Sequence, residues 1–120
     1  MWTYRAELDR VIDGDTVDLE IDLGFKIKHR VRVRLKDVDT PELRGAEKEE
    51  GKRYKQAVID WFMRHGDKCY LKTEKTGKYG RWIGTIWGEN DKTGEPDFLE
   101  IFLKWMLGQE GGQRDGRKDQ

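Results

Sequence analysis

The chain has 120 residues, of which 40% are charged and 35% are hydrophobic, so it suits a single domain with a small core. Basic and acidic residues number 24 each, and this formal net charge of zero argues against a protein that holds nucleic acid by bulk charge alone. The single cysteine, Cys69, excludes an intrachain disulfide and a multi-cysteine zinc site, and we expect an inert core thiol. No apolar run is as long as a membrane span and no signal-peptide pattern is present, so we expect a soluble protein of unknown compartment.

The first half of the chain indicates three strands and a helix. Residues 2–12 have a strand-like composition, and the Asp13-Gly14-Asp15 sequence that follows suits a tight turn. Apolar residues alternate with acids over 17–23 and with bases over 25–36, as in a half-buried hairpin. Residues 46–65 carry an apolar stripe at helical spacing.

The hairpin has one register that matches every acid with a base. It pairs Asp22 with Lys26, Glu20 with Lys28 and Asp18 with Arg30. In this register most of the bases belong to a cross-strand ladder of surface charges, and His29 points inward.

The second half indicates two more strands, at 69–73 and 82–87, and a short helix at 98–107. This helix is apolar on nearly every side, so it is either well buried or half of a homodimer contact. Residues 108–120 are polar and glycine-rich, and we expect them to form a disordered tail outside a domain of residues 1–107.

The order of elements predicts the fold class. Three strands, a helix, two strands and a helix suit an α+β protein, mainly β: a five-stranded Greek-key barrel with a helix inserted after strand three and a second short C-terminal helix. An open antiparallel sheet with two helices is the alternative.

Three short stretches carry residues suited to phosphodiester chemistry. They are Asp13-Gly14-Asp15-Thr16, then Arg34 followed by Asp39-Thr40-Pro41-Glu42, and Lys78-Tyr79-Gly80-Arg81. Carboxylates beside turn residues suit a hard cation, and a planar guanidinium grips two phosphate oxygens at once. Each stretch taken alone has a simpler explanation, as a turn cap, a surface charge on a strand or an acidic helix start.

The ordered set, extended to residues 11–17, resembles the staphylococcal nuclease (thermonuclease) family. The resemblance implies an OB-fold barrel, a Ca²⁺ cofactor, and hydrolysis of DNA and RNA, single strands preferred, with the 5′-oxygen leaving and 3′-phosphate products. The hairpin between Asp15 and Arg34 is longer than in the family's founding member, so we expect its charged ladder to project beyond the barrel.

The resemblance also implies a role for each matching residue. Asp15, Asp39 and the carbonyl of Thr40 would bind the Ca²⁺. The phosphate would be held by Arg34 and Arg81, and Glu42 would act as general base or position the attacking water. Lys78 and Tyr79 would contact a terminal phosphate.

Two other functions stay open. A catalytically inactive OB-fold module would bind nucleic acid or a protein partner without cleaving it, and the zero net charge and apolar last helix favour it slightly. A homodimer through residues 98–107 would add an interface to either function.

Overall fold

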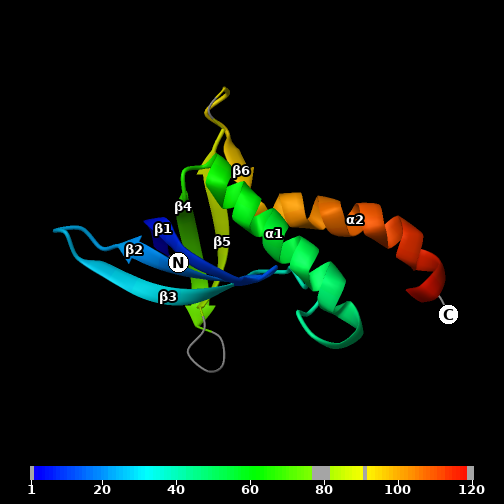
Figure 1. Ribbon diagram of the computed structural model, residues 1–120. Coiled ribbons are helices and arrows are strands. Elements are labelled where there is room, and N and C mark those ends of the chain that lie inside the picture. Colours follow the sequence, from blue (N-terminus) through cyan, green and yellow to red (C-terminus); the bar gives the residue numbers. More distant parts are fainter. Residues whose placement is uncertain (1, 77–81, 91, 119–120) are drawn as a thin grey trace.

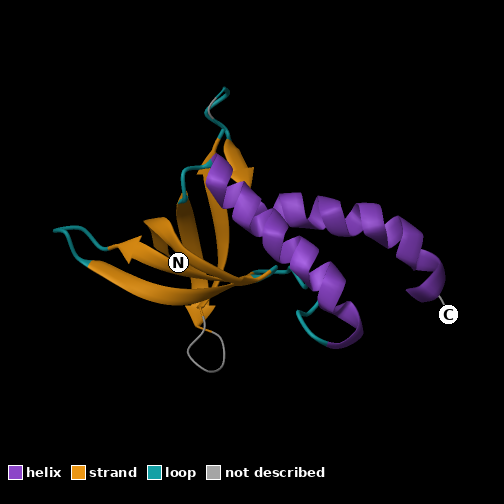
Figure 2. Cartoon of the chain, viewed as in Figure 1, coloured by secondary structure: helices purple, strands orange, loops and turns teal. Residues whose placement is uncertain are grey.

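The computed structural model describes residues 2–76, 82–90 and 92–118 (Figure 1). The strands are β1 (Trp2–Asp13), β2 (Thr16–Asp22), β3 (Lys28–Leu35), β4 (Lys68–Thr76), β5 (Trp82–Glu89) and β6 (Pro96–Phe98). The helices are α1 (Lys48–Arg64), which a short 3-10 turn at Gly45–Glu47 precedes, and α2 (Leu99–Lys118). Figure 2 shows both helices on one side of the strands.

Five of the strands close into a barrel. Their order is β3-β2-β1-β4-β5, and a parallel pairing of β3 with β5 joins the two edges. This closure confirms the predicted barrel with a helix after its third strand, and it overturns the open-sheet alternative. The short β6, which the sequence did not indicate, extends the sheet beside β5.

The hairpin of β2 and β3 is confirmed, but its predicted register is wrong by two residues. The observed pairs are Asp22 with Lys28, Glu20 with Arg30 and Asp18 with Arg32. Residues 23–27 form the turn, closed by a 2.9 Å hydrogen bond from the Leu23 N–H to the Ile27 carbonyl. Because the shift is two residues, each side chain keeps its face and each acid still faces a base. His29, on the same face as Val31, is nevertheless exposed rather than buried.

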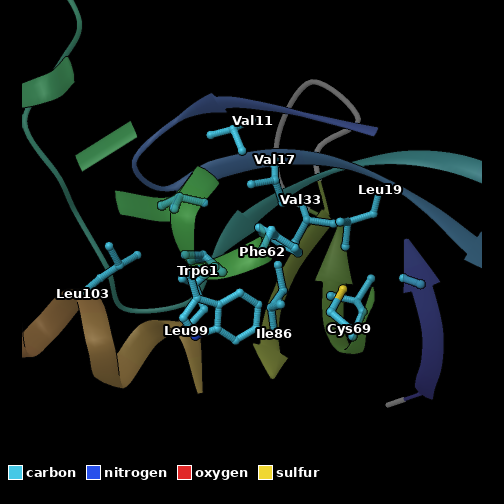
Figure 3. Packing of buried hydrophobic residues seen from close by; sticks show 14 of the residues in the cluster. Val11, Val17, Leu19, Val33, Trp61, Phe62, Cys69, Ile86, Leu99 and Leu103 are labelled. Atoms are coloured by element: carbon cyan, nitrogen blue, oxygen red, sulfur yellow. The ribbon is translucent and has the colours of Figure 1, made fainter. Parts of the chain in front are cut away.

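The core lies between the barrel and the two helices. Figure 3 shows Trp61 and Phe62 of α1 and Leu99 and Leu103 of α2 among the apolar side chains of the strands. Cys69 belongs to this cluster, and burial raises the pKa of its thiol to about 12. The expected inert thiol is confirmed, because so little of it ionises at neutral pH.

The last helix is longer than expected, because it continues past residue 107 to Lys118. Good helix formers such as Gln109 and Arg114 stand between its glycines. Their helix propensity was overlooked when the polar, glycine-rich composition was taken to indicate a disordered tail. The division of the chain at residue 107 stays a prediction. Among the described residues, no helix combines the length and apolar character that crossing a membrane requires.

Packing within the chain explains much of the apolar pattern of α2. Leu99 and Leu103 are fully buried, and Phe102, Met106 and Leu107 pack partly buried against the same core. Of the helix's apolar residues, Ile101 and Trp105 are the exposed ones among those described. The predicted homodimer is therefore not supported, since burial against the barrel accounts for the side chains that suggested it.

Candidate functional site

The turn between β1 and β2 holds Asp15 in a buried position. The Asp15 N–H donates to Asp13 Oδ1 at 3.0 Å, which closes the turn as the sequence indicated. Asp15 itself is 9% exposed; its Oδ1 accepts from the Thr16 hydroxyl and its Oδ2 from the Thr40 N–H at 3.2 Å. Burial, together with the neighbouring carboxylate of Asp13, raises the pKa of Asp15 despite these two donors. Burial therefore disfavours the ionised form of this carboxylate.

Arg34 lies beside this carboxylate because the hairpin register pairs it with Thr16. Its Nη2 is 3.7 Å from Asp15 Oδ2 and 3.5 Å from Asp39 Oδ1. Its Nη1 donates to the Leu35 carbonyl, and about a third of the side chain is exposed. One guanidinium therefore links a buried carboxylate with an exposed one, since the Asp39 side chain is 92% exposed.

Two glycines allow the segments of the site to approach one another, and the sequence interpretation did not identify this role. A Cβ at Gly14 would lie 2.6 Å from the Thr40 hydroxyl and 2.7 Å from Tyr54 Cβ. A Cβ at Gly51 would collide with the backbone carbonyl of Glu42. Gly14 thus brings the Asp15 turn against Thr40, and Gly51 brings the Glu42 loop against α1. For Gly51, the signal available in the sequence was a glycine inside an otherwise helical pattern, which can mark a close approach of backbone.

Glu42 lies on the surface of the loop before α1. Its N–H donates to Glu47 Oε2 at 3.2 Å, and its own Oε2 is 3.6 Å from Arg44 Nε. The side chain is 69% exposed. Its predicted action as general base stays a prediction.

The remaining predicted site residues, Lys78, Tyr79 and Arg81, lie outside the described residues. The chain is described again from Trp82, which pairs with Val33, and Ile83 then pairs with Arg34. The start of β5 is therefore beside the end of β3 that carries Arg34. The roles of the three residues stay predictions.

Ca²⁺ binds several oxygen ligands and accepts water among them, so the oxygen atoms of Asp15, Asp39 and Thr40 are the ones to consider as its ligands. In the described part of the chain, no cluster of three or more carboxylate, histidine or cysteine side chains gathers around one point. Asp15 and Asp39 nevertheless converge on one cation, the guanidinium of Arg34, and the Thr40 hydroxyl is buried without a hydrogen-bond partner. These residues fit a weak Ca²⁺ site that water and substrate oxygens complete, rather than a closed protein cage.

Comparison with known proteins supports the resemblance. The chain is 43% identical over 93 residues to Protein ParB of Escherichia coli, which covers 77% of this chain and 46% of that protein. It is 31% identical over 84 residues to micrococcal nuclease of Shigella flexneri, which covers 70% of this chain and 42% of that protein. The matched part is thus less than half the length of either relative. No protein-family model matches the chain.

Proposed function

Because the chain belongs to the staphylococcal nuclease-like family, we propose that it is a calcium-dependent nuclease that hydrolyses phosphodiester bonds of DNA and RNA. The contact of the Arg34 guanidinium with both Asp15 and Asp39 carries the proposal. A phosphate-binding cation beside two carboxylates is the arrangement that this chemistry requires, because one part holds the substrate and the other holds a metal.

Asp15, Asp39 and the Thr40 carbonyl would hold the Ca²⁺, which supplies a Lewis acid for the phosphoryl oxygens. The raised pKa of Asp15 supports this assignment, because its burial leaves the carboxylate in need of a cation. The exposure of Asp39 supports it as well, since an ion and a substrate must enter from solvent.

Arg34 and Arg81 bind the scissile phosphate and stabilise the charge that builds on its oxygens in the transition state. Glu42 accepts a proton from the attacking water, or positions that water. The water oxygen bonds to phosphorus, the bond to the 5′-oxygen breaks, and that oxygen takes a proton from solvent, so the products carry a 3′-phosphate and a 5′-hydroxyl. Lys78 and Tyr79 contact a terminal phosphate of the bound strand.

Single strands are the preferred substrate in this proposal. Two-thirds of the Arg34 side chain is buried, so a phosphate has to approach it closely along the barrel surface. A flexible single strand achieves that approach at less deformation energy than a stiff duplex.

Cleavage of end-labelled single-stranded DNA and RNA, with Ca²⁺ and then with an excess of chelator, tests the proposal. We expect cleavage with Ca²⁺, its loss with chelator, and products with 3′-phosphate ends. Asp39→Asn should abolish the Ca²⁺-dependent cleavage, whereas Asp37→Asn, at an exposed neighbouring position, should behave as the wild type. Cleavage that survives chelation would contradict the proposal, and binding without cleavage would favour the inactive OB-fold module.

A further inference from the structure

The turn of the β2–β3 hairpin presents an aromatic ring to solvent. Figure 1 shows this hairpin projecting away from the helices. Phe25, at its tip, is 97% exposed, and its neighbours Leu23 and Ile27 are 45% and 55% exposed. The ring therefore contributes almost nothing to the core, and its presence needs another explanation.

The backbone conformation of the tip is also unfavourable for a phenylalanine. Phe25 and Lys26 have φ angles of 52° and 62°, and the Ile27 N–H donates to the Gly24 carbonyl at 2.8 Å. This is the turn with two left-handed central residues, which Asn-Gly forms with least strain and a bulky side chain forms with more. A phenylalanine at this position is unfavourable for the turn and unused by the core, so its ring is available for contact with a ligand.

The chemistry around Phe25 indicates the ligand. Lys26 adjoins the ring, and exposed basic side chains follow on the outer face of β3, those of Lys28, Arg30 and Arg32, before the partly buried Arg34. Arg10 and Arg32 share the single carboxylate of Asp18, and Arg30 pairs with Asp9 at 3.3 Å. Glu20 faces Arg30 and Asp22 faces Lys28 across the hairpin, and Lys26 lies in the turn beyond these pairs. An aromatic ring beside basic side chains suits a single nucleic-acid strand, because its nucleobases can stack on the ring and its phosphates can pair with the cations.

The geometry links this tip to the candidate site. At about 3.3 Å per residue, β3 carries Lys28 about 20 Å from Arg34, with the bases between them on one face. A strand bound at Arg34 can therefore run along the outer face of the hairpin, and only a strand of several nucleotides reaches Phe25.

We propose that the hairpin tip, residues 23–27, is a second contact for single-stranded nucleic acid, where Phe25 stacks on a base several nucleotides away from the phosphate at Arg34. The inference rests on the proposed function for the class of substrate. Beyond that function, it states that a longer strand binds more tightly because it reaches Phe25, whether or not it is cleaved.

Fluorescence anisotropy with a labelled single-stranded DNA of about twelve nucleotides and with a labelled dinucleotide tests it, in chelator so that no cleavage occurs. We expect Phe25→Asn to raise the Kd for the longer strand about tenfold and to leave dinucleotide binding unchanged. Phe25→Trp should retain wild-type affinity. Because asparagine favours this turn, Phe25→Asn should not lower the thermal midpoint, which separates loss of a contact from loss of structure.

Trp105→Ala is the matched control, since it removes another exposed aromatic ring, on α2. Wild-type affinity of Phe25→Asn for the longer strand would overturn the inference, as would an equal loss in Trp105→Ala or no binding of the longer strand by the wild type. These results do not depend on Ca²⁺, whereas the proposed nuclease is tested separately, by cleavage in the presence of Ca²⁺ and its loss with chelator.

Discussion

Two buried carboxylates on the same hairpin, Asp15 and Asp18, have opposite electrostatic surroundings. Asp18 is 4% exposed and meets two arginines: Arg32 Nε at 2.8 Å from Oδ1 and Arg10 Nε at 3.2 Å from Oδ2. The hydrogen bond from Arg32 is the main reason that the pKa of Asp18 is lowered. Among the described residues, the cation in contact with Asp15, at 9% exposure, is Arg34 at the longer distance of 3.7 Å, and burial raises the pKa of Asp15.

This difference separates a structural carboxylate from a functional one. The charge of Asp18 is satisfied within the fold, where it joins β1, β2 and β3. Among the described residues, the charge of Asp15 is less well compensated, although the turn, Gly14 and Thr40 all hold it in place. A buried carboxylate that is well positioned but poorly compensated is suited to bind a cation supplied from outside.

The largest expected effect is on catalysis at Arg34. Arg34→Lys keeps a positive charge beside Asp15 but loses the two-pronged contact with a phosphate, so kcat should fall about 10²–10³-fold. Arg32→Lys, on the same face beside Asp18, should change kcat little. Steady-state cleavage assays with both variants compare the two clusters, and near-normal turnover by Arg34→Lys would remove this residue from the mechanism.

Gly14→Ala should give the next largest effect. Its new methyl group would overlap Thr40 and the Cβ of Tyr54, neither of which is the free end of a flexible side chain. We expect the free energy of unfolding to fall by about 1–3 kcal/mol, measured by urea denaturation, with a loss of cleavage. Gly108→Ala, where the same methyl group meets open space on α2, should be neutral or slightly stabilising. Equal stabilities for the two variants would show that the close approach at Gly14 is unimportant.

Asp18→Asn should destabilise the fold by about 1 kcal/mol, since the partner arginines are themselves well exposed and solvent screens them. The lowered pKa of Asp18 sets the pH dependence. Its contribution is present above about pH 4 and is lost as pH falls through the lower folded-state pKa, so wild type and variant should converge in acid. A gap that persists at pH 2 would argue against the ion pairs as its source.

Asp15→Asn should have the smallest effect on stability and the opposite sign. Because folding raises the pKa of Asp15, ionisation of this residue lowers the free energy of unfolding. The loss is absent in acid and grows as pH rises above the unfolded-state pKa. In chelator at pH 7 the variant should therefore unfold at the same temperature as the wild type or slightly above it. A clear loss of thermal stability at pH 7 would place Asp15 in the same structural class as Asp18.

The sequence predicted the barrel, its inserted helix and the hairpin because alternation of polar and apolar residues reflects burial directly. It did not predict the hairpin register, because every acid meets a base in either of two registers and the turn decides between them. The turn has two non-glycine residues at positive φ, Phe25 and Lys26, which no local propensity favours. The length of α2 was not predicted, because the glycines after residue 107 indicated a disordered tail although the residues between them favour a helix.

For the site, the resemblance carried by the ordered motifs made Asp15, Arg34 and Asp39 candidates, and the fold brings these three together. It could not show that Asp13 closes the turn while Asp15 lies buried, because an Asp-Gly-Asp sequence suits either arrangement. The close approaches at Gly14 and Gly51 depend on contacts with distant segments, which a single sequence does not reveal.

Calorimetric titration of Ca²⁺ in the presence of a non-hydrolysable nucleotide tests the central claim most directly, with wild type, Asp15→Asn and Asp18→Asn compared well below their thermal midpoints. The account predicts binding by the wild type and by Asp18→Asn, and its loss in Asp15→Asn. Undiminished binding by Asp15→Asn, or an equal loss in Asp18→Asn, would contradict the assignment of Asp15 as the carboxylate reserved for the cation.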